Sequence, residues 1–158
     1  MPLTHEDKMR YTKTLATVAT GTFTGGTAFH LCNVHPTMMK DFSIENALKM
    51  QKGITLRIAP LVGSLVVGLG AAGAVYYMAN DRKEALPWLV GSGTLALVFP
   101  YTAYFLSPLN TKIKTDQVTA AEGPAVMMRW YRFAAGRAVT TFAVFSYFAY
   151  LCTKKSEE

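Results

Sequence analysis

The sequence has few charged residues, few cysteines and few histidines. Charged residues make up 16% of the 158 residues, whereas soluble domains usually carry about 25%. The chain has two cysteines and three histidines, which excludes a disulfide scaffold and a metal centre that needs many histidines. The low charge argues against a soluble enzyme domain. The 51% of apolar residues argue against intrinsic disorder.

Four segments lack Asp, Glu, Lys and Arg altogether: residues 14–39, 58–80, 85–111 and 138–153. The first three can cross a bilayer core of about 30 Å as helices that rise about 1.5 Å per residue. The fourth reaches that length by starting near Phe133 and including Arg137. We therefore predict an all-α fold, a bundle of four transmembrane helices that forms one integral membrane domain over residues 1–158. The predicted spans are about 13–34, 57–78, 86–106 and 133–153.

The connections between the predicted spans carry turn and surface signals. Residues 41–56 mix apolar and charged side chains, which predicts an amphipathic segment at the membrane surface in the first loop. The short charged link at 81–84 predicts an antiparallel hairpin of spans two and three. Proline interrupts helices, so we expect Pro36 to end the first span or to start the next short element, and Pro100 to kink the third span.

Small residues recur at helical spacing in the first two spans. Such residues allow helices to approach closely in a membrane. The second span carries Ser64, Gly68 and Ala72, and the first carries Gly21 and Gly25. Threonines form a further stripe on the first span, which predicts a packing face or, alternatively, a polar path for a substrate; they are Thr17, Thr20, Thr24 and Thr27.

The spans offer little material for metal or cofactor binding. No acidic residue lies inside a span, and all three histidines precede or occupy the first connection. His30 and His35 are five positions apart, so we expect them to point to different faces of a helix. We predict no metal and no cofactor. The net charge of +6 comes from basic residues at span ends, which is typical of membrane anchoring, so we also predict no nucleic-acid partner.

A candidate site arises from the topology, because five residues at span ends share one side of the membrane. Arg137 matters most, since a cation inside an apolar span is costly unless it reaches the interface or finds a partner. One interpretation is interfacial anchoring. The other is a polar pocket under the two long loops that binds an anionic or carbonyl-bearing ligand. The residues are His35, Arg57, Asn110, Trp130 and Arg137.

These residues also carry a family resemblance. Pro100-Tyr101-Thr102, Pro108-Leu109-Asn110, Trp130 and Arg137 resemble the closing pattern of the anthrone-oxygenase-like family of small four-span membrane proteins. The glycine-rich first span before His35-Pro36, and Arg57 three residues before Pro60, are similar to its first half, so the resemblance covers about residues 18–150. It implies a four-helix membrane bundle and, for some members, cofactor-independent oxidation of an anthrone-like polyketide by molecular oxygen to a quinone.

The resemblance implies pocket roles for Asn110, Trp130 and Arg137. One position departs from the family pattern W-x-x-x-[H/N]-x-x-R, because Ala134 stands where the pattern has His or Asn. Alanine cannot accept a proton, so a general base has to come from elsewhere, with His35 as a candidate, or is missing.

Two functions of different classes remain open. Because no complete set of catalytic residues can be placed, we predict an accessory or structural subunit of a larger membrane complex, with lipid and other membrane subunits as partners. The alternative is a cofactor-independent oxygenase, or a binder of a hydrophobic aromatic or quinone-like molecule, with its ligand near Trp130 and Arg137. For the host membrane, we prefer the mitochondrial inner membrane over the endoplasmic reticulum.

Overall fold

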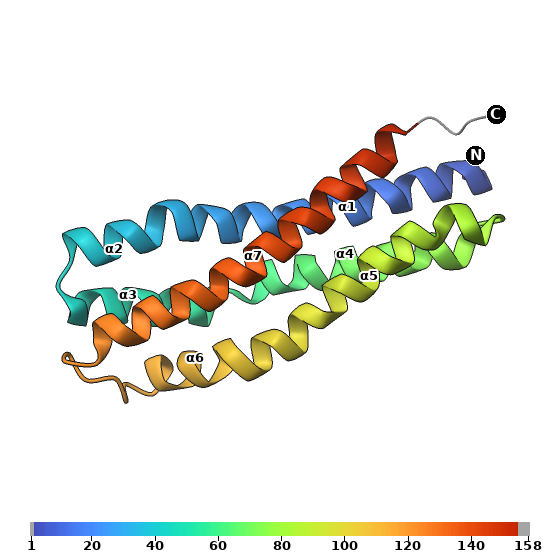
Figure 1. Cartoon of the computed structure of the whole chain (residues 1–158). Helices are drawn as coiled ribbons and strands as arrows, with labels where there is room; N and C mark the ends of the chain where they lie inside the picture. Colours follow the sequence, from blue (N-terminus) through green and yellow to red (C-terminus); the bar gives the residue numbers. More distant parts are fainter. Residues whose placement is uncertain (1, 155–158) are drawn as a thin grey trace.

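The computed structural model describes residues 2–154, which form four helical rods that run side by side (Figure 1). The described residues contain helices and no strand, which confirms the all-α prediction. The first rod joins α1 (His5–Phe29), the π-helix η1 (His30–Val34) and α2 (His35–Asp41). The other three rods are α3 (Ile44–Arg57) with α4 (Ala59–Met78); α5 (Arg82–Tyr101) with the π-helix η2 (Thr102–Leu106) and α6 (Ser107–Lys114); and α7 (Gly123–Thr153).

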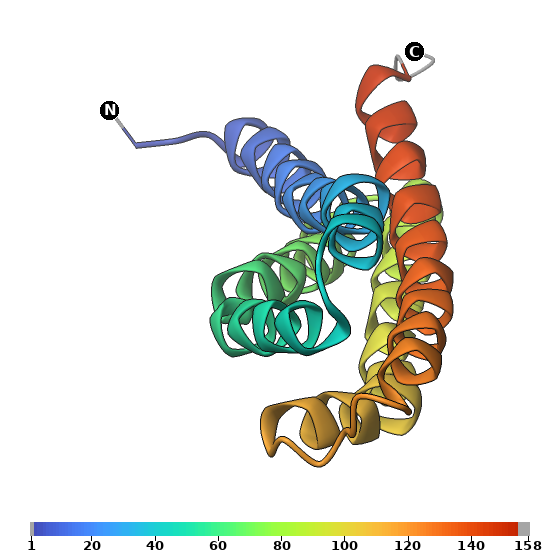
Figure 2. The ribbon, with the colours of Figure 1, turned by 90° about the vertical axis from the view of Figure 1, so that its left-hand side faces the viewer.

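The four rods form a ring, and at the α2–α3–α6 end α3 also reaches α7 across it. Helix α1 packs against α4 and α7, and α5 packs against the same two helices. The α4–α5 turn lies at the same end as both ends of the described chain, while α2, α3 and α6 gather at the other end (Figures 1 and 2). The predicted antiparallel hairpin of the second and third spans is therefore confirmed.

Local sequence signals explain where helices begin. The Thr4 hydroxyl accepts a hydrogen bond from the Asp7 amide, and the Asp7 carboxylate accepts one from the Thr4 amide, a reciprocal capping box. Ser43 and Asp81 cap α3 and α5. In each case a side-chain oxygen accepts a hydrogen bond from a backbone amide in the first turn.

Two helical segments are long and apolar enough to cross a bilayer by length and composition: Ala59–Met78 and the continuous Arg82–Lys114. These correspond to the second and third predicted spans. The finding supports association with a membrane. Four crossings would also require α1 and α7 to span the membrane.

The first loop is more ordered and more buried than the predicted surface segment. Residues 44–57 form α3, which continues into α4 after the single residue Ile58 and packs against α2, α6 and α7. Its buried face is small and polar, formed by Ala47, Gln51 and Thr55. The helix thus closes one end of the bundle.

Pro36 starts a short helix, which is one of the two outcomes that we expected. It lies in the first turn of α2, and the first rod continues to Asp41. A π-helical turn directly precedes Pro36, and there the His35 amide donates to the carbonyl of His30, five residues earlier. The third rod repeats this arrangement, because η2 directly precedes Ser107 and Pro108. A π turn thus leads into α2 and into α6 without a break in the rod.

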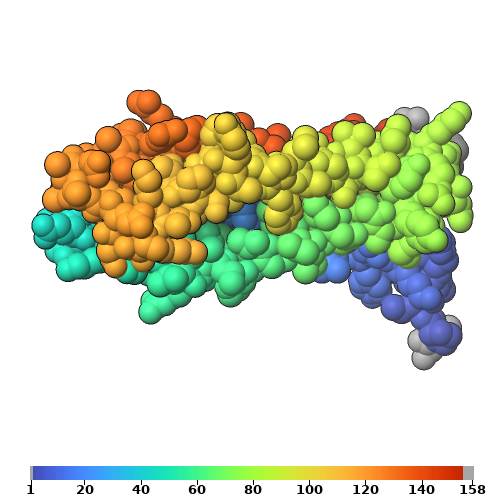
Figure 3. Space-filling view, turned by 90° about the horizontal axis from the view of Figure 1, so that it is seen from below, coloured from blue at the N-terminus to red at the C-terminus, as the bar shows by residue number. Residues whose placement is uncertain are grey.

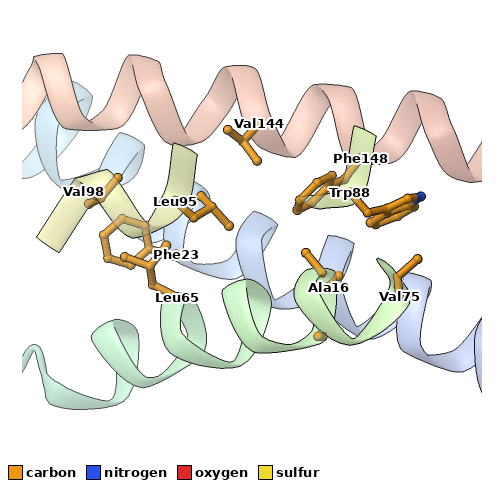
Figure 4. Close-up of a cluster of buried hydrophobic side chains, with 11 residues drawn as sticks. Ala16, Phe23, Leu65, Val75, Trp88, Leu95, Val98, Val144 and Phe148 are labelled. Carbon is orange, nitrogen blue, oxygen red and sulfur yellow. The ribbon is translucent and has the colours of Figure 1, made fainter. Parts of the chain in front are cut away.

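Two apolar cores fill the ring, one near each end. The core near the termini is shown in Figure 4, where Phe23, Leu65, Leu95 and Val98 lie at one side and Trp88 lies against Phe148 at the other. The Trp88 and Phe148 rings stack with centroids 4.7 Å apart. The second core surrounds Leu106, Met127 and Trp130 at the end formed by α2, α3 and α6.

The predicted small-residue faces are partly correct. Gly68 lies against helix α1, and a Cβ there would be 2.5 Å from the Thr20 hydroxyl. Gly25 is different, because a Cβ at that position would meet nothing within 4 Å. The buried threonines donate to carbonyls four residues earlier in their own helix, as Thr20 does to Ala16 and Thr24 to Thr20. The stripe therefore packs, and its hydroxyls do not line a polar path.

Candidate functional site

A cluster of polar and aromatic side chains lies at the α2–α3–α6 end of the bundle. Its centre is Trp130 on α7, which is 5% exposed. The Trp130 Nε1–H donates a hydrogen bond of 2.8 Å to Oδ1 of Asn110 on α6. Asn110 therefore holds the indole in place, and the structure brings together two of the five predicted site residues.

His35 is the third predicted residue in this cluster. It is 4% exposed, its ring is parallel to that of Trp130 with centroids 6.4 Å apart, and it contacts Tyr131 at 4.7 Å. Its Nε2–H donates to the Met127 carbonyl at 3.3 Å. Burial lowers the pKa of His35, and the hydrogen bond opposes this more weakly, so the ring is neutral at pH 7. The hydrogen bond orients the ring and leaves Nδ1 as its unprotonated nitrogen, so the role of His35 as a general base stays a prediction.

His30 joins the same cluster, contrary to our expectation. Residues five apart on an α-helix point in directions about 140° apart. The π-helix η1 closes its hydrogen bonds over five residues, so His30 and His35 lie on the same face. The His30 ring meets Trp130 edge to face at 5.2 Å, and its Nε2 is buried without a hydrogen-bond partner.

Arg137 is a buried cation without a counter-ion in the described residues. It is 7% exposed, its Nε has no hydrogen-bond partner, and its guanidinium lies over the Phe23 ring at 5.4 Å. A buried unpaired charge costs on the order of several kcal/mol, and a desolvated cation–π contact offsets about 2 kcal/mol or somewhat more of this. The side chain therefore does not reach the interface to anchor the helix, and a cost remains that an anionic or carbonyl ligand can offset.

Arg137 and Trp130 share one face of α7. They are seven positions apart, about two helical turns, and the fully buried Ala134 lies between them. Tyr101 closes this face from the third rod, because its hydroxyl donates to the Phe133 carbonyl at 3.1 Å. A Cβ at Gly136 would be 2.9 Å from that hydroxyl oxygen, so glycine at 136 allows Tyr101 to approach beside Arg137.

Gln51 is a site residue that we did not predict. It lies on α3 with no exposed surface, and neither its amide nitrogen nor its amide oxygen has a hydrogen-bond partner. The amide lies beside the His30 ring without the geometry of a hydrogen bond. A signal was present in the sequence, since Ala47, Gln51 and Thr55 repeat at four-residue spacing and form the buried face of α3.

Arg57 does not join the cluster. It is exposed at the end of α3. Two surface hollows are also separate from Arg57 and Arg137. One of about 740 Å³ lies at the terminal end and includes His5, Trp88 and Lys154. One of about 270 Å³ lies between α3 and the chain after α6 and includes Glu45 and Asp116.

The described residues define a small all-helical protein with a desolvated polar cluster near one end. The chain belongs to the anthrone oxygenase family, because the family model matches residues 54–147. The match confirms the resemblance and includes Asn110, Trp130 and Arg137, while His30, His35 and Gln51 precede it. No significant match was found among curated proteins or among solved structures.

Proposed function

We propose that the protein is a four-span membrane enzyme that binds a planar aromatic ketone. In this proposal, molecular oxygen oxidises an activated methylene of the ketone to a second carbonyl, so that a quinone forms. The methylene and one O₂ give one carbonyl and one water, which balances atoms and electrons. The oxidant is the dissolved gas, which concentrates in the apolar part of a bilayer together with the ketone.

The observation that carries the proposal is the unpaired Arg137. Loss of a proton from the methylene places negative charge on the ketone oxygen, and a donor already aimed at that oxygen in a desolvated site stabilises it strongly. The Arg137 Nε–H has no other partner. Trp130, held by Asn110, supplies a flat aromatic surface two turns along the same helix. The family match gives independent support for this class of reaction.

Apolar surface on every rod supports four crossings. Exposed large apolar side chains occur on the two rods that meet the span criterion and equally on the other two: Val18 and Phe29 on α1, Val139 and Phe142 on α7. Lipid is the solvent that accepts such side chains. Figure 3 shows a narrow opening between the surfaces of α4 and the α5–η2 segment, with α1 visible at its bottom. A lipid-soluble ketone can reach the bundle interior through this lateral opening.

The test uses the full chain in lipid nanodiscs with 9(10H)-anthracenone as the substrate. Oxygen uptake and quinone absorbance are followed in air, and binding is followed under argon by quenching of Trp130 fluorescence in a Trp88→Phe variant. We expect one O₂ consumed per quinone, at a rate above that of empty nanodiscs. Spontaneous oxidation at the same rate in empty nanodiscs would contradict the proposal.

The accessory-subunit interpretation stays a prediction, as do the partner subunits and the mitochondrial location. No described contact and no match favours them over the enzyme. Native sizing after mild detergent extraction tests the subunit prediction, which requires migration well above the mass of a single chain in its micelle.

A further inference from the structure

His30 differs from His35 in having a fully buried ring nitrogen without a hydrogen-bond partner among the described residues. The Nε2 of His35 is engaged by the Met127 carbonyl, whereas the Nε2 of His30 is fully buried and has no partner among the described residues. Buried polar atoms in folded proteins are almost always hydrogen-bonded. A free buried nitrogen therefore indicates a ligand group that completes its bonding.

The groups around His30 form one constellation from three rods. His30 comes from η1, Gln51 from α3 and Arg137 from α7. All three side chains have buried polar atoms without partners: Nε2 of His30, both amide atoms of Gln51 and Nε of Arg137. Trp130 contacts His30 edge to face at 5.2 Å. Three rods thus supply an acceptor and several donors without partners, and Gln51 and Arg137 lie near enough to His30 to act on its ring.

We infer that His30 is the catalytic base of this site, an inference that rests on the proposed function. The methylene C–H bond breaks, the proton goes to His30 Nε2, and the electron pair passes into the ring system and onto the ketone oxygen. Arg137 and the Gln51 amide donate to that oxygen. The carbanion carbon then bonds O₂, and the outer peroxide oxygen takes the proton from His30 to form a hydroperoxide. The O–O bond breaks and the remaining hydrogen of that carbon leaves with the hydroxyl group as water, so that the new carbonyl remains.

The geometry explains why the base comes from the first rod. Ala134 lies between Trp130 and Arg137 on α7 and carries no titratable group. His30 faces this part of α7 because the π turn of η1 directs it toward Trp130. The spans contain no carboxylate that could serve instead. Of the two histidines that meet this part of α7, His30 is the one with a buried nitrogen that no described residue engages.

The test compares His30→Gln with His5→Gln, a matched change at an exposed histidine near the chain start. In nanodiscs with 9(10H)-anthracenone, we expect His30→Gln to bind with an unchanged Kd and to lose about 10²- to 10⁴-fold in quinone formation. The ionisation of the base should disappear from its pH–rate profile. His5→Gln should match the unchanged protein in rate and in pH profile.

A second variant keeps the test decisive where glutamine disturbs the fold. His30→Ala with added imidazole should recover about tenfold or more of the lost rate, because a diffusible base replaces the missing proton acceptor. Normal turnover by His30→Gln, or a loss in His30→Ala that imidazole does not reverse at intact binding, overturns the role of His30 alone. If the unchanged protein neither binds nor oxidises the ketone, the proposed function fails and the role of His30 fails with it.

Discussion

Arg137 is held in a position that is unfavourable for folding. Its Nε has no partner, and the guanidinium is covered by Phe23. Residues that lower the stability of the fold and make no compensating contact are expected at functional sites. Arg129, eight positions earlier on the same helix, also lies over an aromatic ring, that of Phe133, but it is exposed. Both arginines carry a charge and only Arg137 is buried, so a comparison of the two shows what burial of the charge does.

We predict that Arg137→Met stabilises the protein and weakens ligand binding. Replacing a buried, unpaired cation by an apolar side chain of similar length should raise the free energy of unfolding by about 1–3 kcal/mol. Loss of a charged donor should raise the Kd for 9(10H)-anthracenone by about tenfold or more. Thermal unfolding in detergent and Trp130 quenching under argon measure the two effects.

Arg129→Met is the matched control for this prediction. Because Arg129 is exposed, its replacement should change the free energy of unfolding by less than about 0.5 kcal/mol and leave binding unchanged. A destabilised Arg137→Met variant, with Arg129→Met unaffected, would show that Arg137 has a structural partner.

At the scale of elements, the π-helix η1 decides which residues reach the site. An uninterrupted α-helix from His5 to Asp41 would separate the directions of His30 and His35. The π turn brings both rings to Trp130. A second π turn, η2, follows Tyr101, whose hydroxyl lies beside the residue before Arg137. π turns are frequent at functional sites, and here both occur in rods that supply site residues.

Helix packing predicts opposite effects on stability when Gly68 of α4 and Gly25 of α1 are each replaced by alanine. A Cβ at Gly68 would meet the Thr20 hydroxyl at 2.5 Å and the Thr20 backbone nitrogen at 3.1 Å. Gly68→Ala should therefore force α1 and α4 apart and lower the free energy of unfolding by about 1–3 kcal/mol. Gly25→Ala meets no neighbour and should raise it by about 0.5–1 kcal/mol through helix propensity. Unfolding in mixed detergent micelles measures both, and equal stability of the two variants would contradict the packing.

At the scale of the whole molecule, the number of crossings sets which parts of the chain share a side of the membrane. If all four rods cross, the chain start and the α4–α5 turn share one side, and residues 115–122 lie on the other. If only the two helices that meet the span criterion cross, the chain start and residues 115–122 share a side. With four crossings the chain start therefore shares a side of the membrane with the α4–α5 turn, and with two crossings it shares a side with residues 115–122.

Single cysteines test this topology. In a chain with Cys32→Ser and Cys152→Ser, we place one cysteine as Leu3→Cys, Asn80→Cys or Ala120→Cys, all at exposed positions. A membrane-impermeant thiol reagent is applied to sealed vesicles. Leu3→Cys and Asn80→Cys should be labelled to the same extent, and Ala120→Cys to a different extent. Labelling after permeabilisation is the control for reactivity. Equal labelling of Leu3→Cys and Ala120→Cys in sealed vesicles would refute four crossings.

The sequence by itself determined the helices, because uncharged segments of spanning length and local caps such as Thr4 and Asp7 act within a few residues along the chain. Through the family pattern it also predicted Asn110, Trp130 and Arg137 as site residues. The tertiary structure decided the rest. His30 could not be assigned because its direction depends on a π turn. Gln51 could not be assigned because its burial depends on how α3 packs against other rods, and Arg57 was excluded by the same packing. Contacts between distant rods are set by the whole bundle, and no spacing within one segment encodes them.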